Sequence, residues 1–210
     1  MKKAILGTKL GMLQIFDEAG RVVPVTVVQA GPCVVTQVKT RENDGYEAIQ
    51  VGYAPAKEKH INQPLKGHFV KQGVAAMRHL REFRLDDISP FAAGSEIRAD
   101  IFAEGDIVDV TGVSKGKGFQ CSIKRHGFHR GPMEHGSKYH RRTGSLNAKG
   151  PAKVWPGRKA PGRMGGDTVT IQGLHVVRVD ADKDLILIKG AIPGARKAVV
   201  MIKNSIKGGK

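Results

Sequence analysis

Cysteine, tryptophan and acidic side chains are scarce in this chain of 210 residues. The two cysteines, Cys33 and Cys121, lie far apart, and no Cys-x-x-Cys pair exists. This excludes a paired-thiol redox motif and a cysteine-rich zinc site. We therefore expect a reduced protein whose cysteines form no disulfide.

Long apolar runs are also missing. The opening MKKAILGTKLGMLQ starts basic, but Gly7, Thr8 and Lys9 interrupt its apolar residues. That is too early for the core of a signal peptide or for a membrane span. We expect a cytoplasmic protein that is neither secreted nor membrane-bound.

The shortage of acidic residues is concentrated in one part of the chain. Overall, 35 Lys and Arg stand against 19 Asp and Glu, a formal charge of +16. Residues 114–166 hold thirteen of these basic residues and one acidic residue, Glu134, so this quarter of the chain carries +12 and the remainder only +4. Such a distribution points to a polyanionic partner that binds the window 114–166.

Short β-branched runs lie on both sides of this window. Residues 21–40 read as strand, turn and strand around a Gly-Pro pair, and 168–190 alternate polar and apolar positions on either side of a DADKD turn. Further strands are expected at 47–53, 105–113 and in the last apolar run, AVVMIK. Because closing an antiparallel sheet removes its exposed edges, we predict a mainly β fold with a small barrel built from both ends of the chain.

These patterns divide the chain into two parts. Residues 1–113 and 167–210 form the expected globular domain, with an insertion of helix and short strands at about 54–100. The window 114–166 has eleven glycines and few aliphatic residues, so it cannot bury enough apolar surface to form a core. It is predicted to be a long extended loop, with one short helix in FQCSIKRHG (119–127).

No segment has the residue spacing of a nucleotide-binding, metal-binding or catalytic motif. GVSKGKGF (112–119) has three residues, not four, before its Gly-Lys and no Ser or Thr after it. His126 and His129 form the only close histidine pair in a strongly cationic segment, and DADKD lacks the glycine and glutamate of a calcium loop. With no Gly-x-Ser-x-Gly motif either, we expect no enzyme, no cofactor, no metal and no small-molecule substrate.

The window itself fits RNA. Basic side chains neutralise phosphates, aromatic and guanidinium planes stack on unpaired bases, and glycine allows close backbone approach. Trp155, the only tryptophan, lies in PAKVWPGRKAPGRMGG among prolines and basic residues, where no protein core can cover it. Alternatives are a solvated basic loop, a non-specific nucleic-acid condensing protein, and an enzyme that uses the barrel to hold a flavin or nucleotide.

Three segments resemble a known family. FAEGDIVDVTGVSKGKGFQCSIKR (102–125), RGPMEHGSKYHRRTGSL (130–146) and GPAKVWPGRKAPGRMGG (150–166) are similar to the third large-subunit ribosomal protein in its bacterial form. The opening AILGTKLGMLQIF and VVRVDADKDLILIKGAIPGA extend the similarity over nearly the whole chain. Cys121 stands where that family usually has glycine, and Thr143 where it usually has proline.

The resemblance implies a six-stranded antiparallel barrel of the translation-factor type and a structural role in the large ribosomal subunit. It implies direct binding to large-subunit rRNA, neighbouring large-subunit ribosomal proteins as partners, early action in assembly, and a loop directed towards the peptidyl-transferase centre. The residues expected to bind rRNA are Lys115, Lys117, Lys124, Arg125, His126, Arg130, His135, Lys138, Tyr139, His140, Arg141, Arg142, Ser145, Lys149, Lys153, Trp155, Arg158, Lys159, Arg163 and Met164.

Overall fold

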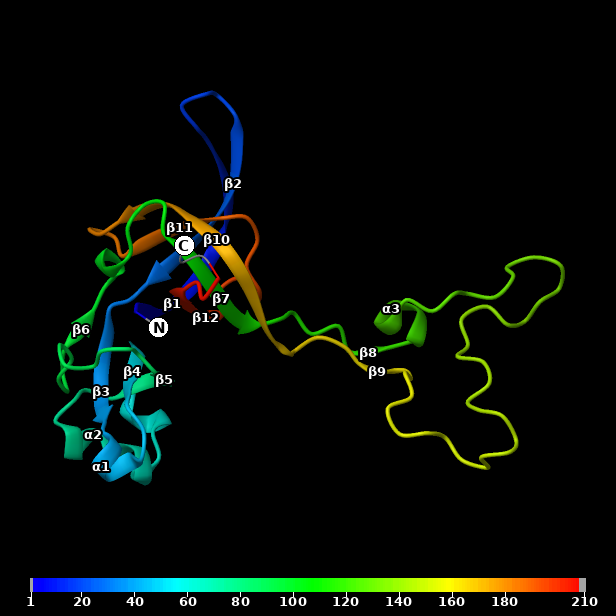
Figure 1. The fold of residues 1–210 in the computed structure, drawn as a ribbon, viewed down its shortest axis with the longest axis horizontal. Helices are drawn as coiled ribbons and strands as arrows, with labels where there is room; N and C mark the ends of the chain where they lie inside the picture. The colour runs from blue at the N-terminus through cyan, green and yellow to red at the C-terminus, as the bar shows by residue number, and fades with distance from the viewer. Residues whose placement is uncertain (1, 208–210) are drawn as a thin grey trace. The chain divides into compact units, whose positions relative to one another are not determined.

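The computed structural model describes residues 2–207, and their contacts divide the chain into two units. One unit comprises residues 1–113 and 168–210, and the other residues 114–167. The first contains a closed, fully antiparallel six-stranded barrel (Figure 1). In order around the barrel its strands are β1 (Ala4–Phe16), β12 (Val199–Asn204), β7 (Ile107–Val113), β10 (Thr168–Asp180), β11 (Leu185–Lys189) and β2 (Val22–Ala30).

A second antiparallel sheet packs within the same unit. Its order is β5 (Met77–Phe83), β4 (Ala48–Pro55), β3 (Cys33–Lys39) and β6 (Glu96–Ile97). The short helix α1 (Arg41–Asp44) connects β3 to β4, and α2 (Gln63–Gln72) precedes β5, with single 3-10 turns at Glu58–His60 and Ala99–Ile101. Asn62 caps α2 by accepting the Leu65 N–H at 3.1 Å, and Gly73 ends the helix in the left-handed region at φ 66°.

The mainly β fold and the six-stranded barrel are confirmed, but the set of strands that forms the barrel differs from expectation. The predicted strands at 33–40 and 47–53 belong to the second sheet, whereas the barrel takes a long strand from residues 4–16, where the sequence indicated none. Gly7 interrupts the apolar pattern because a Cβ there would lie 2.6 Å from the Gln29 carbonyl oxygen. Lys9 is buried, and its Nζ donates to the Ile192 carbonyl at 2.8 Å. Packing against distant segments of the same chain therefore overrides the local sequence pattern at Gly7 and Lys9.

One continuous core joins the barrel to the second sheet. Ile5, Ile186 and Ile202 from the barrel and Ile49 and Val51 from the sheet are all fully buried in the same cluster. Burial of this kind contributes about 1.5–3 kcal/mol for each large aliphatic side chain. The globular unit therefore has its own hydrophobic core, to which no residue of 114–167 belongs among the described residues.

Cys33 makes the stability of this core sensitive to alkali. Its thiol is buried and donates to the Leu6 carbonyl at 3.4 Å, and burial raises the pKa of Cys33 from 9.0 to about 12. The unfolded chain ionises this thiol near pH 9 while the folded chain keeps it neutral. The stability it confers is thus complete below pH 9 and is lost as pH rises towards 12, by about 1.4 kcal/mol per pH unit.

We expect urea unfolding between pH 8 and 11 to show this loss, and the loss to be smaller in Cys33→Ala. The variant starts less stable at pH 8 because a buried side chain is truncated, but its stability should fall less steeply with pH. Parallel stability curves for the two proteins would contradict the assignment.

Candidate nucleic-acid interface

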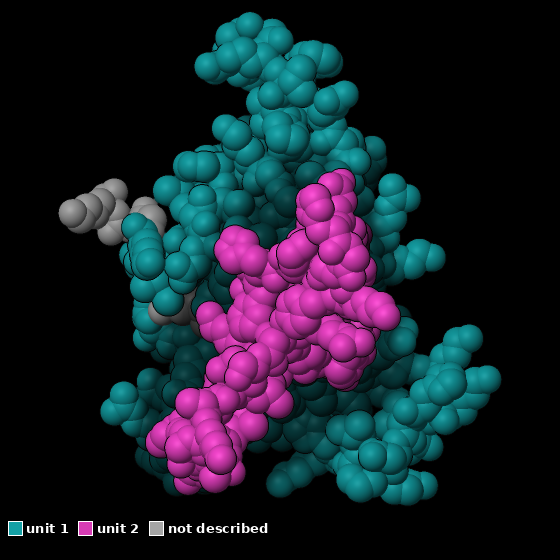
Figure 2. All heavy atoms as spheres, turned by 90° about the vertical axis from the view of Figure 1, so that its right-hand side faces the viewer, with its two compact units in different colours: residues 1–113, 168–210 teal, residues 114–167 magenta. Residues whose placement is uncertain are grey.

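The unit of residues 114–167 is coloured magenta in Figure 2. Backbone pairing between its two ends closes its base. Ser114 N–H donates to the Asp167 carbonyl at 2.9 Å, and Lys117 N–H donates to the Met164 carbonyl at the same distance. Strands β8 (Phe119–Gln120) and β9 (Gly162–Arg163) continue this antiparallel pairing. The chain therefore leaves and re-enters the barrel, through β7 and β10, as one paired stem.

Helix α3 (Ser122–His126) follows this stem and is shorter than the sequence indicated. Phe119 and Gln120 were expected within it but form β8 instead, because they pair with Arg163 and Gly162. Cys121 is the extended residue before the helix, and Gly127 ends it at φ 70°. Phe119 is therefore 78% exposed. In the expected helix it would instead have packed beside Ile123, one turn further along.

The helix holds the returning segment by side-chain contacts to backbone. Arg125 Nη1 donates to the Ala160 carbonyl at 2.9 Å, and His126 Nε2 lies 3.2 Å from the same oxygen. A Cβ at Gly162 would lie 2.7 Å from Arg125 Nη1, so a larger residue there would displace the guanidinium from this contact. The guanidinium uses one donor for this contact and has others left for a ligand.

The middle of the loop is held by hydrogen bonds to its own backbone carbonyls. Gly131 N–H donates to the His140 carbonyl at 3.0 Å, and the Tyr139 hydroxyl donates to the Arg142 carbonyl at 2.8 Å. These bonds turn the segment back on itself without an apolar core. Their effect is to fix the backbone while the basic side chains extend outward.

Cys121, which directly precedes α3, and Thr143 are the two positions at which the resemblance leads us to expect glycine and proline. Arg141 Nη2 donates to Cys121 Sγ at 3.3 Å, and the hydroxyls of Ser122 and Thr143 are 3.3 Å apart. A hydrogen bond from the Lys124 backbone N–H lowers the pKa of the Cys121 thiol, and Arg141 lowers it further. Both side chains therefore take part in contacts that tie the middle of the loop to its helix.

Trp155 lies near the tip of the loop with 57% of its surface exposed. Lys153 Nζ is 5.7 Å from the ring centroid, a cation–π distance. Nearby, Arg158 Nη2 donates to the Ser145 carbonyl at 2.6 Å, and Asn147 Nδ2 donates to the Lys153 carbonyl at 3.0 Å. The tip is thus a folded turn that presents an indole face and several cations to its surroundings.

All twenty predicted rRNA-binding residues lie in this unit, and all but His126, His140 and Met164 are exposed. Over residues 2–207, every ion pair belongs to the globular unit, so no basic side chain of the loop is neutralised by a carboxylate. Charges left unpaired on a segment without a core are suited to phosphate contacts.

Exposed apolar side chains in the same unit were missed by sequence reasoning. They are Phe119, Met133, Leu146 and Val154. The signal was present in the composition: where no core can form, an apolar residue must face outward. Such side chains can pack against bases or sugars between phosphate contacts.

The described residues contain no group of three or more His, Cys, Asp or Glu side chains placed to hold a metal ion. Likewise, none of the helices between residues 2 and 207 has the length and apolar character that crossing a bilayer requires. The DADKD segment forms the turn between β10 and β11, as expected.

Comparison with known proteins gives the family. The chain is 60% identical to the large ribosomal subunit protein uL3 of Desulfitobacterium hafniense, over 99% of this chain and 98% of that one. It is also 60% identical to the uL3 of Carboxydothermus hydrogenoformans, over 99% of this chain and all of the other. The chain belongs to the ribosomal protein L3 family. A model of that family, described as Ribosomal protein L3, matches residues 89–184, a range that includes the whole of the basic loop.

Membership settles several expectations from the sequence. The ribosomal protein L3 family is a family of structural proteins, not of enzymes. Its members belong to the large ribosomal subunit, and so to the ribosome in the cytoplasm. The unit of residues 114–167 is thus the candidate RNA interface of a large-subunit ribosomal protein of the L3 family.

Proposed function

We propose that the chain binds large-subunit rRNA directly through residues 114–166, while residues 1–113 and 167–210 fold as the globular domain that carries this loop. One observation supports this above all. Residues 114–166 carry thirteen Lys and Arg residues against one acidic residue, Glu134, and form no ion pair with any residue in 2–207. A protein segment that keeps so many unpaired cations together gains free energy when a polyanion covers it.

The stem and the tip have different roles in this proposal. Lys115, Lys117, Lys124 and Arg125 lie at or near the paired stem, where they contact rRNA as the loop enters it. The tip around Trp155 inserts among bases, and its direction is towards the peptidyl-transferase centre, as the family resemblance implies. Binding of this kind orders rRNA around the loop and suits a protein that acts early in subunit assembly, alongside neighbouring large-subunit ribosomal proteins.

Trp155→Ala tests the role of the tip. Loss of a stacking surface should lower affinity for large-subunit rRNA by about 1–3 kcal/mol. The melting temperature of the free protein should stay unchanged, because the indole is more than half exposed and packs in no core. Filter binding with rRNA fragments and thermal unfolding measure the two effects.

Phe16→Ala is the matched control, since that ring is 70% exposed on the globular unit. It should change neither measurement. A fall of several degrees in the melting temperature of Trp155→Ala, with unchanged rRNA affinity, would mean that the indole supports the protein fold instead.

A further inference from the structure

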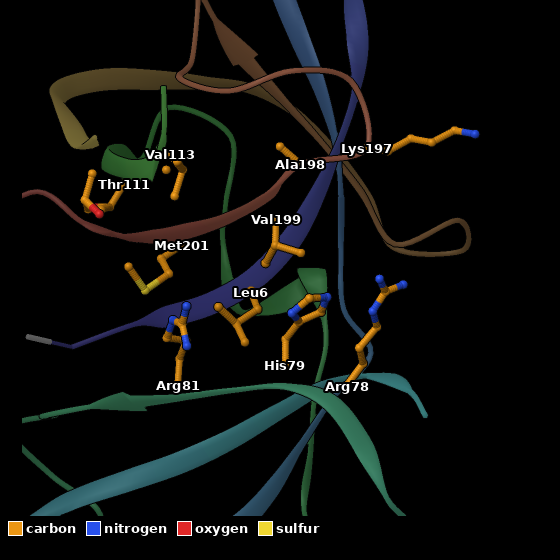
Figure 3. A pocket seen from close by; sticks show the side chains of 12 residues that line it. Leu6, Arg78, His79, Arg81, Thr111, Val113, Lys197, Ala198, Val199 and Met201 are labelled. Carbon is orange, nitrogen blue, oxygen red and sulfur yellow. The ribbon is translucent and has the colours of Figure 1, made fainter. Parts of the chain in front are cut away.

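A hollow in the globular unit lies outside the basic loop. It has a volume of about 400 Å³ and is bounded by β5 on one side and by barrel strands β1, β7 and β12 on the other (Figure 3). β5 is an edge strand of the second sheet, paired only with β4. This volume is at the lower end of the range for small-ligand sites, about 300–1,000 Å³. We call it the β5 hollow.

The register of β5 directs two polar side chains into this hollow. His79 is opposite Tyr53 and Arg81 is opposite Val51, and both partners are buried on the core side of the sheet. Residues directly opposite in an antiparallel pair share a face, so His79 and Arg81 also face the core side. Figure 3 shows His79 directed towards Leu6 and Arg81 towards the Met201 side of the hollow.

The charged lining of the hollow is entirely basic. Arg78, Arg81 and Lys197 line it, and no acidic residue does. Over residues 2–207 none of these three cations forms an ion pair, and the hydrogen bond of Arg81 goes to the carbonyl of its own neighbour, Leu80, at 2.8 Å. Glu82, the nearest acid in sequence, is engaged by Lys39 at 3.0 Å.

His79 adds a neutral ring to this lining. Partial burial lowers the pKa of His79, and the charges of Arg78 and Arg81 lower it further. The imidazole is therefore uncharged at neutral pH, with one donor and one acceptor nitrogen. Such a ring can stack on a base or hydrogen-bond to its edge.

The floor of the hollow is apolar. Val199 and Met201 of β12 are half-buried beneath it, and Val113 at the end of β7 is 52% exposed beside them. A phosphate gains nothing from such a floor, whereas the flat face of a base is covered by it. The ligand that matches both features has an apolar plane joined to a phosphate.

We propose that the β5 hollow binds one unpaired nucleotide of RNA, with its base on the Val199–Met201 floor and its phosphate against Arg78, Arg81 and Lys197. The proposal rests on the proposed binding to rRNA and adds to it a second contact, on the globular unit, for a base displaced from its stack. The site needs no contribution from residues 114–167.

The probe is adenosine 5′-monophosphate, titrated into the full chain and followed through the methionine methyl NMR signals. The chain has six methionines, and the Met201 signal is assigned by its loss in Met201→Leu. We expect the nucleotide to shift the Met201 methyl through the ring current of its base. Inorganic phosphate at equal ionic strength should leave that methyl in place.

Arg78→Gln with Arg81→Gln should weaken nucleotide binding about tenfold, because charge-assisted hydrogen bonds are lost while the side-chain stems remain. Lys59→Gln with Lys71→Gln removes equal charge from exposed positions of the same unit and should change binding less than twofold. Retained methyl dispersion in both proteins reports that the fold is intact.

Three results would overturn the assignment. The first is no Met201 shift with the nucleotide, and the second is an equal shift with phosphate alone. The third is displacement of the nucleotide by a glutamate-rich peptide that shifts the same methyl as strongly, which would indicate an acidic protein partner. Binding of rRNA by the loop is measured separately, so its persistence in any of these cases leaves the proposed function standing.

Discussion

Replacing residues 127–163 by a short glycine linker is expected to lower affinity for large-subunit rRNA about 10³-fold or more near physiological salt, the margin by which specific binding exceeds non-specific binding. The replaced segment contains nine Lys and Arg residues and the exposed Trp155. If all nine contact phosphates, the slope of log affinity against log salt should fall by about six to eight units, since each contact contributes about 0.7–0.9.

The barrel should survive this replacement. The β7–β10 ladder ends at the pair Val113 and Thr168, outside the replaced segment, and the Ser114–Asp167 hydrogen bond is also retained. Thermal unfolding of the linker protein should therefore match that of the intact chain. An rRNA affinity within tenfold of the intact chain, with an unchanged salt slope, would place the RNA contacts elsewhere.

The largest effect on stability is expected from Ile202→Ala. Ile202 is fully buried in β12, opposite Ile5 on one neighbouring strand and Val110 on the other, both fully buried. Truncating such a side chain removes apolar burial and leaves a cavity, at a cost of about 2–5 kcal/mol. For a domain of this size a loss of about 3 kcal/mol lowers the melting temperature by roughly 6–12 °C.

Ile206→Ala is the matched control because the same residue type, four positions later, is 75% exposed. Its melting temperature should stay within about a degree of that of the intact chain. Equal effects of the two substitutions would show that β12 does not contribute to the core as described. Differential scanning calorimetry measures both.

Much of the barrel could be predicted because its strands carry their own signal. The β-branched alternation of 22–30 and 168–180 is local, and it survives in β2 and β10. β1 was missed because Gly7 and Lys9 break its apolar pattern. Both residues are explained by contacts with distant segments: the Gln29 carbonyl leaves no room for a Cβ at Gly7, and the Ile192 carbonyl accepts a hydrogen bond from the Lys9 ammonium. Long-range contacts of this kind leave no local signature.

The division of strands between the two sheets was equally beyond a local pattern. β2 and β3 read as one hairpin in sequence, yet β2 pairs with β1 and β11 while β3 pairs with β4 and β6. Pairing partners are chosen by packing across the whole unit. Sequence alternation identifies a strand but not its neighbours.

The loop was predictable in composition and not in detail. Its glycines and cations excluded a core, and the exposed positions of Lys138 and Trp155 agree with that. The hydrogen bonds from Arg125 and His126 to Ala160 depend on a chain reversal that no local pattern encodes. The β5 hollow was also hidden, because its cations become neighbours of the apolar floor only when β5 lies against the barrel.

The central claim is that the order of residues in the loop, and not its charge alone, selects large-subunit rRNA. The most direct test is equilibrium binding to a set of large-subunit rRNA fragments in excess tRNA, comparing the intact chain with one whose residues 114–166 are scrambled at constant composition. We predict that the intact chain stays bound to one rRNA fragment in the presence of excess tRNA. Scrambling residues 114–166 should abolish this preference. If all RNAs compete equally and the scrambled chain binds as well, the protein condenses nucleic acid non-specifically and the claim is wrong.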